Sequence, residues 1–114
     1  MSLALVAPAG AQTIKLGELN SYKVFPAFLE PYKKGMELAI DEVNAGGGVL
    51  GRKLELVVRD DNGNPGDAVR VAEELLSREG AAFLVGTFPS NVGLAVADFA
   101  KQRKVLFLAA EPLT

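Results

Sequence analysis

The chain has 114 residues, about the length of one ordinary domain. Its 12 Lys and Arg residues nearly balance 14 Asp and Glu residues, and the net charge of −2 gives no electrostatic reason to expect nucleic acid or an anionic membrane as a partner. The absence of both His and Cys excludes the usual zinc sites, thiol nucleophiles and Ser-His-Asp catalysis. No apolar run reaches the roughly 18 residues that a membrane-spanning helix needs.

The N-terminal segment differs in composition from the rest of the chain. Leu3 to Ala11 is apolar, uncharged and rich in alanine, and its end fits the small-x-small pattern that signal peptidase cuts. We interpret residues 1–12 as a residual signal peptide with an added start at Met1. The mature protein would then begin near Gln12 and be exported. The alternative is a loosely packed N-terminal arm.

From Thr13 onward the pattern alternates between strands and helices. Residues 14–19 alternate apolar and polar side chains, as a short strand does. After a polar and aromatic loop, apolar residues recur at steps of three and four and predict a helix with one apolar face. The glycine-rich segment 44–48 ends this helix, and residues 54–59 predict the second strand. The apolar face of the helix comprises Leu29, Tyr32, Met36, Ala39, Ile40 and Val43.

The second half of the chain continues the alternation. A turn over residues 60–65 leads into the second helix, with Asn64 as the expected N-cap and Pro65 at the first helical position. Gly80 ends this helix. The remaining elements are a fully apolar third strand at residues 82–85, a third helix from about 91 to 103, and a fourth strand at 105–109.

The order β-α-β-α-β-α-β with short connections predicts an α/β fold of three layers, in which helices cover both faces of a mainly parallel sheet. The apolar runs of the third and fourth strands fit burial on both faces. No helix follows the fourth strand, so we interpret the sequence as part of a larger protein. The fourth strand is then a bare edge, through which we expect this chain to dimerise.

Ligands of open parallel sheets bind outside the carboxyl ends of the strands. Residues 86–91 lead from the third strand into a helix, where backbone N–H groups and the Ser90 hydroxyl can bind an anion such as a carboxylate. The alternative is that Ser90 only caps the helix. Aromatic residues crowd the loop after the first strand, where they either wall an apolar pocket or hold the helix to the sheet. They are Tyr22, Phe25, Phe28 and Tyr32.

Two other motifs are not interpreted as ligand sites. The glycine-rich run 46–51 follows a helix and opens a strand, whereas a nucleotide-binding loop follows a strand and opens a helix. The pair Asp60-Asp61 is interpreted as a solvated turn in which Asp61 accepts hydrogen bonds from local backbone amides. We therefore predict no cofactor, no metal and no enzymatic activity.

Three segments in a fixed order carry a family resemblance. They are Glu37-Leu-Ala-Ile-Asp-Glu-Val-Asn44, Gly47-Gly-Val-Leu-Gly-Arg-Lys-Leu-Glu-Leu56, and Asp60-Asp61 with Asn64-Pro65. Together they resemble the N-terminal lobe of leucine/isoleucine/valine-type periplasmic binding proteins, the type I solute receptors of ABC importers. The resemblance covers residues 13–114 and implies the first part of lobe one, without the hinge and the second lobe.

The resemblance implies a function as well as a fold. Proteins of this family are periplasmic, close two lobes on an amino acid or related small polar molecule, and deliver it to a membrane permease. Ser90 matches the family residue whose hydroxyl and amide hold the ligand's carboxylate, and Phe28 matches an aromatic residue that covers the ligand side chain. Phe88, Pro89, Glu111 and Leu113 match positions that line the pocket or contact the ligand head group.

Two departures from the family pattern bear on the ligand. After the fourth strand, Glu111 places negative charge where a carboxylate would approach, and only Thr114 offers the family's hydroxyl. The glycine-rich first loop is replaced by residues 20–31, which contain two prolines and several aromatic residues. Branched-chain amino acids, ligands with a cationic or amide group facing Glu111, and larger aromatic ligands all stay open. The alternative function is a ligand-sensing domain of a receptor or regulator with the same fold.

Overall fold

The computed structural model describes residues 12–112, so the segment 1–11 and the predicted site residue Leu113 lie outside the described residues. All the predicted strands and helices are present in the predicted order. They are β1 (Ile14–Asn20), α1 (Pro26–Ala45), β2 (Leu54–Asp60), α2 (Pro65–Ser77), β3 (Phe83–Gly86), α3 (Ser90–Arg103) and β4 (Phe107–Ala109). No helix among residues 12–112 is long and apolar enough to cross a membrane.

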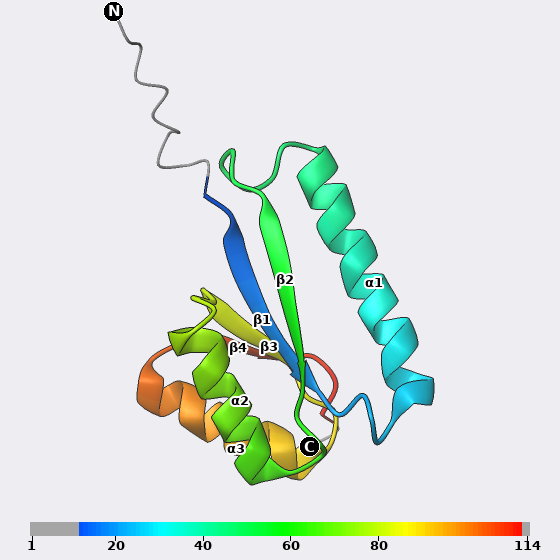
Figure 1. Ribbon diagram of the computed structural model, residues 1–114, viewed down its shortest axis with the longest axis vertical. Coiled ribbons are helices and arrows are strands. Elements are labelled where there is room, and N and C mark those ends of the chain that lie inside the picture. Colours follow the sequence, from blue (N-terminus) through cyan, green and yellow to red (C-terminus); the bar gives the residue numbers. More distant parts are fainter. Residues whose placement is uncertain (1–11, 113–114) are drawn as a thin grey trace, which may run out of the picture.

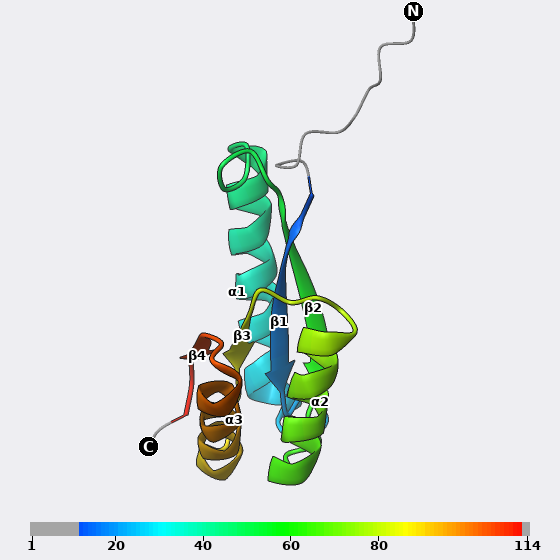
Figure 2. The same cartoon turned by 90° about the vertical axis from the view of Figure 1, so that its left-hand side faces the viewer.

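The four strands form one parallel sheet in the order β2-β1-β3-β4. β1 lies inside the sheet, because β2 pairs with its whole length and β3 pairs with its residues 16–19. Helix α1 covers one face of the sheet, and α2 and α3 lie against the other (Figure 1 and Figure 2). The predicted three-layer α/β fold with a parallel sheet is therefore confirmed.

The main core lies between the sheet and the layer of α2 and α3. Helix α2 begins as predicted, with Pro65 as its first residue and the Asn64 side chain accepting a hydrogen bond of 2.9 Å from the Asp67 backbone N–H. Its apolar residues recur every three or four positions and so face the sheet together. The buried core comprises Leu19, Val57, Ala68, Val71, Ala72, Leu75, Leu84, Val92 and Val96.

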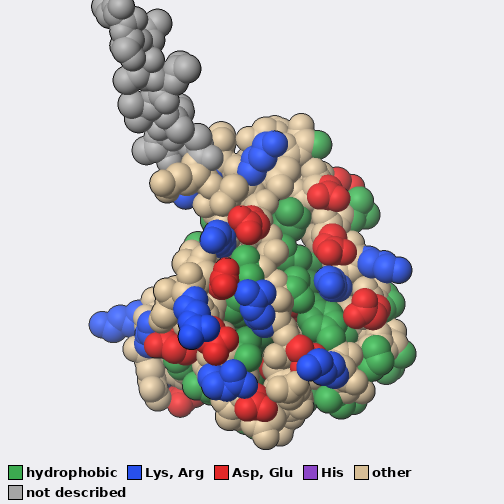
Figure 3. Space-filling view, in the orientation of Figure 1, with side chains coloured by type: hydrophobic (Ala, Val, Ile, Leu, Met, Phe, Trp, Pro, Cys, Tyr) green, Lys and Arg blue, Asp and Glu red, His purple; other side chains and the backbone are tan. Residues whose placement is uncertain are grey.

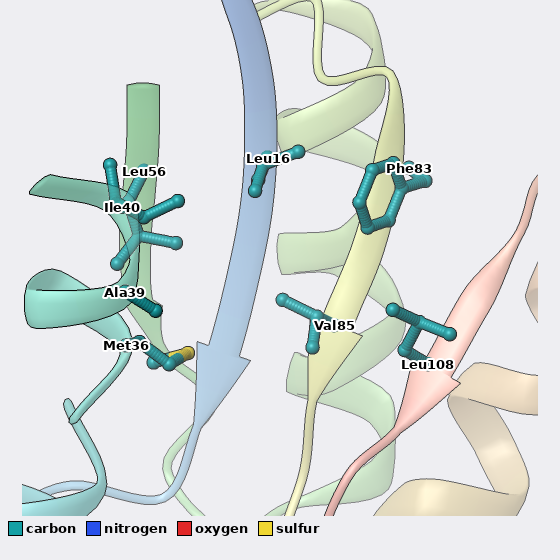
Figure 4. A pocket seen from close by; sticks show the side chains of 8 residues that line it. All are labelled: Leu16, Met36, Ala39, Ile40, Leu56, Phe83, Val85 and Leu108. Atoms are coloured by element: carbon teal, nitrogen blue, oxygen red, sulfur yellow. The ribbon is translucent and has the colours of Figure 1, made fainter. Parts of the chain in front are cut away.

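The α1 side of the sheet is packed less tightly than predicted. Leu29 is the one residue of the predicted apolar face of α1 that is buried. Met36, Ala39 and Ile40 instead face a cavity of about 170 Å³ between α1 and the sheet (Figure 4). Figure 3 shows hydrophobic side chains in this hollow, with charged side chains of both signs around it. The sheet contributes Leu16, Leu56, Phe83, Val85 and Leu108 to the cavity wall.

Strand β4 is shorter and more exposed than predicted. Helix α3 ends in a left-handed cap at Lys104, and the chain joins the sheet only at Phe107. Leu108 and Ala109 are exposed, so burial of the fourth strand on both faces is wrong. Leu108, which lines the cavity beneath α1, is exposed because no helix within residues 12–112 covers the α1 side of β4 (Figure 2). β4 pairs only with β3 and is an edge, as predicted. Dimerisation through this edge stays a prediction.

The glycine-rich run 46–51 ends α1 and turns the chain into β2, as predicted. Gly48 has a φ of 80°, and a Cβ there would lie 2.1 Å from the carbonyl oxygen of Arg52, so only glycine fits. The Asn44 side chain holds the two elements together. Its Nδ2 donates to the Leu54 carbonyl at 2.9 Å, and its Oδ1 accepts from the Leu54 N–H at 2.7 Å.

We predict that Asn44→Ala lowers the free energy of unfolding by about 1–3 kcal/mol, because it leaves both partly buried backbone groups of Leu54 without their partner. Urea denaturation measures this change. Gln102→Ala is the control, since the exposed Gln102 side chain bonds only to Asp98 within α3 and its loss should change stability by less than about 0.5 kcal/mol. Equal effects of the two substitutions would show that Asn44 does not stabilise the connection.

Candidate ligand-binding site

The carboxyl ends of the four parallel strands meet at one edge of the sheet, the lower end in Figure 1. The loops after β1, β2 and β3 leave the sheet there and lead into α1, α2 and α3. In open α/β sheets this edge is the place where ligands bind. The candidate site is therefore built from these loops and from the segment after β4.

A buried carboxyl group lies at the end of β1. Glu18 has no exposed surface, and both of its oxygens accept hydrogen bonds, from the Tyr22 hydroxyl at 2.8 Å and from Asn20 Nδ2 at 3.0 Å. Burial raises the pKa of Glu18 from 4.5 to about 7. The two hydrogen bonds oppose this rise in pKa, whereas the nearby charges of Asp61 and Glu111 add to it.

Glycine lets β3 end directly against this carboxyl group. Gly86 has a φ of 128°, and a Cβ there would lie 2.2 Å from the Leu19 carbonyl oxygen and 3.0 Å from Glu18 Oε2. The next residue, Thr87, has a φ of 63° and donates its N–H to the same Leu19 carbonyl at 2.9 Å. Thr87 is buried, and its hydroxyl has no hydrogen-bond partner among residues 12–112. After this sharp turn, the chain from Phe88 onward runs along the carboxyl edge of the sheet into α3.

The turn after β2 differs from the prediction in one respect. Asp61 accepts a hydrogen bond of 2.9 Å from the Gly63 backbone N–H, as predicted, but it is buried and not solvated. The loop after β1 covers it, and the Ser21 hydroxyl donates to Asp61 Oδ1 at 2.5 Å. Burial raises the pKa of Asp61. Asp60 Oδ1 accepts a hydrogen bond of 2.9 Å from the Lys23 backbone N–H. This exposed bond also links the loop after β1 to the turn after β2.

Three phenylalanines pack together at this edge, two from the start of α1 and one from the loop between β3 and α3. Phe25 meets Phe88 edge to face at 5.0 Å between ring centroids, and Phe28 stacks on Phe88 at 5.8 Å with 23° between the ring planes. These contacts fasten the start of α1 to the loop between β3 and α3. Phe28 is nevertheless 66% exposed. The structure thus brings together two predicted site residues, Phe28 and Phe88.

The start of α3 differs from the prediction by one residue. Pro89 occupies the N-cap with an extended backbone, and no side chain caps the helix. Ser90 is therefore the first helical residue, and its interpretation as an N-cap is wrong because the required extended conformation falls on Pro89. The first-turn N–H groups of α3 lack intrahelical partners and form the positive end of the helix dipole. The half-buried Ser90 lies beside them.

Glu111, after β4, completes the described part of the predicted site. Its Oε1 is buried and has no hydrogen-bond partner within the described chain, and burial raises its pKa. Five of the six predicted site residues thus lie at the carboxyl edge, and their contact with a ligand stays a prediction. Three buried polar residues that the sequence pattern did not single out also lie at this edge, namely Glu18, Ser21 and Thr87. Glu18 and Ser21 lie at the carboxyl end of the central strand β1. Polar residues at that place in the sequence pattern indicate buried polar groups next to the carboxyl edge.

Two alternatives to the carboxyl edge are a metal site and the cavity beneath α1. Residues 12–112 contain no group of three or more acidic side chains placed to hold a metal ion. The cavity beneath α1 is walled by apolar side chains, so it offers no anchor for a polar ligand (Figure 4). The carboxyl edge of the sheet is therefore the candidate site.

The buried carboxyl group of Glu18 predicts a pH-dependent stability. Its pKa rises from 4.5 to about 7 on folding, so the folded protein binds more protons between these values and the free energy of unfolding falls as the pH rises through them. Glu18→Gln should remove up to about 3 kcal/mol of this fall, as measured by urea denaturation from about pH 5 to pH 8. The exposed Glu37→Gln should keep the wild-type slope. A wild-type slope in Glu18→Gln would contradict the assignment.

Comparison with known proteins relates the chain to a family. The family model described as "Periplasmic binding protein" matches residues 22–114. The chain is 36% identical over 83 residues to the Leu/Ile/Val-binding protein homolog 2 of Brucella abortus (strain 2308), and the match covers 73% of this chain and 22% of that protein.

Two solved structures share the fold. The substrate-binding protein LivJ of Streptococcus pneumoniae, in complex with isoleucine, is 27% identical with a TM-score of 0.82, over 90% of this chain and 30% of that chain. A solute-binding protein of Rhodopseudomonas palustris BisB5, in complex with 3,4-dihydroxybenzoic acid, is 25% identical with a TM-score of 0.78, over 88% of this chain and 27% of that one. The chain thus spans less than a third of the length of each of these proteins. With the family model matched from residue 22 to residue 114, the chain belongs to the periplasmic binding protein family.

Proposed function

We propose that residues 13–114 form the first part of lobe one of an extracytoplasmic solute receptor. The receptor binds an amino acid or related small polar molecule and delivers it to the membrane permease of an ABC importer. One observation at the carboxyl edge carries this proposal. The free N-terminus of α3 lies next to Phe88, and the exposed Phe28 stacks on Phe88. The relatives support it, because one solved structure holds isoleucine and another holds 3,4-dihydroxybenzoic acid.

The ligand makes two kinds of contact at this edge, polar contacts with its carboxylate and apolar contacts with the rest of the molecule. The first-turn N–H groups of α3 and the Ser90 hydroxyl bind a carboxylate of the ligand, with the helix dipole assisting. Phe28, Phe88 and Pro89 form the apolar wall beside it. Glu111 faces a part of the ligand that donates hydrogen bonds, and Leu113 contributes a further contact. When a second lobe closes over the ligand, water is excluded and each polar contact becomes stronger.

A solute receptor of this kind acts in the periplasm and does not change its ligand chemically. The protein is periplasmic, and residues 1–12 are a residual signal peptide. Binding and release leave the ligand chemically unchanged, so the protein is a receptor and not an enzyme, and it needs no cofactor. A ligand-sensing domain of a regulator has less support, because the two solved structures are named as binding proteins of transporters.

We predict that Ser90→Ala weakens binding of a carboxylate ligand about tenfold or more, because a hydrogen bond to a charged group contributes about 1.5–3 kcal/mol. A thermal-shift screen of the natural full-length protein against aliphatic, aromatic and cationic amino acids and aromatic acids first finds the ligand. At about 100 times its Kd, a ligand adds about 2.7 kcal/mol of stability. Calorimetric titration then compares wild type with Ser90→Ala.

Ser77→Ala is the matched control for this titration. Ser77 is exposed at the end of α2, which lies at the opposite edge of the sheet, so its loss should leave the affinity unchanged. A screen without any thermal shift would contradict a solute receptor. Equal affinities of wild type and Ser90→Ala would contradict the carboxylate contact alone.

A further inference from the structure

The first turn of α1 has few anchors of its own. Its N-cap residue, Phe25, makes no side-chain hydrogen bond to the helix, and no acidic residue in this turn meets the positive end of the helix dipole. Pro31 lies inside the helix and has no N–H, so it donates no hydrogen bond to the Ala27 carbonyl. The buried Leu29 packs the turn onto the protein. The direction of the exposed Phe28 therefore depends on the loop that enters the helix.

A buried hydrogen bond holds that loop. The Ser21 hydroxyl donates to Asp61 Oδ1 at 2.5 Å, and neither residue has any exposed surface. We call this bond between Ser21 and Asp61 the loop clamp. The Ser21 carbonyl accepts from the Phe25 N–H at 2.9 Å, and the Phe25 carbonyl accepts from the Phe28 N–H at 3.2 Å. An unbroken series of hydrogen bonds thus leads from the turn after β2 to Phe28.

Asp61 is fixed on its own side of the loop clamp. Its Oδ1 also accepts a hydrogen bond of 2.9 Å from the Gly63 backbone N–H, which holds the carboxyl group in the turn after β2. A Cβ built on Gly63 would lie 3.2 Å from Val24 Cγ2 and 3.8 Å from Ser21 Oγ, so the loop lies directly on this turn. Within residues 12–112, Ser21 is the one side chain that donates to Asp61. Removal of the Ser21 hydroxyl therefore removes the clamp.

A second hydrogen bond joins the same two segments at the surface. The Lys23 N–H donates to Asp60 Oδ1 at 2.9 Å. Water competes for both of these exposed groups, whereas the loop clamp is shielded from water. A hydrogen bond in a buried place is electrostatically stronger than one in water. The loop clamp is therefore the stronger of the two connections.

Resting on the proposed function, we propose that Ser21 and Asp61 are positioning residues for ligand binding. Neither side chain has exposed surface, so neither touches the ligand. Their hydrogen bond holds the first turn of α1 in the direction that stacks Phe28 on Phe88, at the apolar wall of the proposed site. A wall that is fixed before the ligand arrives loses less freedom on binding, and the ligand then binds more tightly.

Hydrogen exchange of the natural full-length protein tests the loop clamp without a ligand. In Ser21→Ala the hydrogen-bonded backbone N–H groups within residues 24–29 should exchange about tenfold faster or more, because the loop and the first turn of α1 open more often. The N–H groups of α3 should keep their rates. Ser21→Cys has a weak S–H donor of similar size, so it should give an intermediate increase, and it replaces Ser21→Ala if that variant does not fold. Thermal melting shows which variants are folded.

Asn44→Ala is the matched control, because it loosens the other end of α1 at the opposite edge of the sheet. There the Leu54 N–H, which donates to Asn44 Oδ1, should exchange faster, and the N–H groups within residues 24–29 should keep their rates. An equal rise within residues 24–29 in Asn44→Ala and Ser21→Ala would show that general loosening of α1, and not loss of the clamp, frees the first turn.

Calorimetric titration tests the effect on binding, with isoleucine and 3,4-dihydroxybenzoate as probes. For the probe that binds, Ser21→Ala should weaken binding about fivefold or more, and Phe28→Ala about tenfold. In the double variant, Ser21→Ala should add nothing to the effect of Phe28→Ala, because it acts through that ring. Asn44→Ala should leave the affinity unchanged.

The outcomes separate this inference from the proposed function. Faster exchange within residues 24–29 together with affinity losses that do not add in the double variant would establish the positioning role. Unchanged exchange or unchanged affinity in Ser21→Ala, or losses that add in the double variant, would overturn that role and leave the solute receptor standing. If neither the probes nor any compound of the thermal-shift screen binds the wild type, both are wrong.

Discussion

The structure depends on the position of β1, which has hydrogen-bonded strands on both sides. Because β2 and β3 both pair with it, the end of β1 is buried, and its polar residues need partners within the protein. Glu18 accepts hydrogen bonds from Asn20 and Tyr22, and Ser21 donates to Asp61. These bonds draw the loop after β1 over the turn after β2. The loops of the candidate site are thus placed by the pairing of buried polar groups as well as by apolar packing.

The two faces of the sheet contribute differently to the site. Helices α2 and α3 pack on a continuous apolar core, which gives the β3–α3 loop a firm base. Helix α1 is held mainly near its ends, by Leu29 and the phenylalanine contacts at the carboxyl edge and by Asn44 at the other, with a cavity between. The residues that anchor the start of α1 are therefore also those that form the wall of the proposed site.

The small net charge conceals a strong local asymmetry at this edge. The free N–H groups of α3 favour an anion, whereas Glu18 and Glu111 are acidic side chains at the same edge, near enough for the charge of Glu111 to raise the pKa of Glu18. Both carboxyl groups have a raised pKa because they are buried. Under the proposed function, the negative group of the ligand lies at the N-terminus of α3.

The sequence by itself determined the alternation of strands and helices, the Asn64 cap and the glycine turn before β2, because periodicity, capping and turn geometry act over a few neighbouring residues. It also indicated which loops share the carboxyl edge, since parallel strands all end there. Only the tertiary structure decided that Glu18 and Asp61 are buried, that Phe28 stacks on Phe88, and that β4 stays exposed. Asp61 and Ser21 lie 40 residues apart in sequence, and Phe28 and Phe88 are further apart still. Burial depends on which distant segments cover a residue, and local sequence patterns do not carry that information.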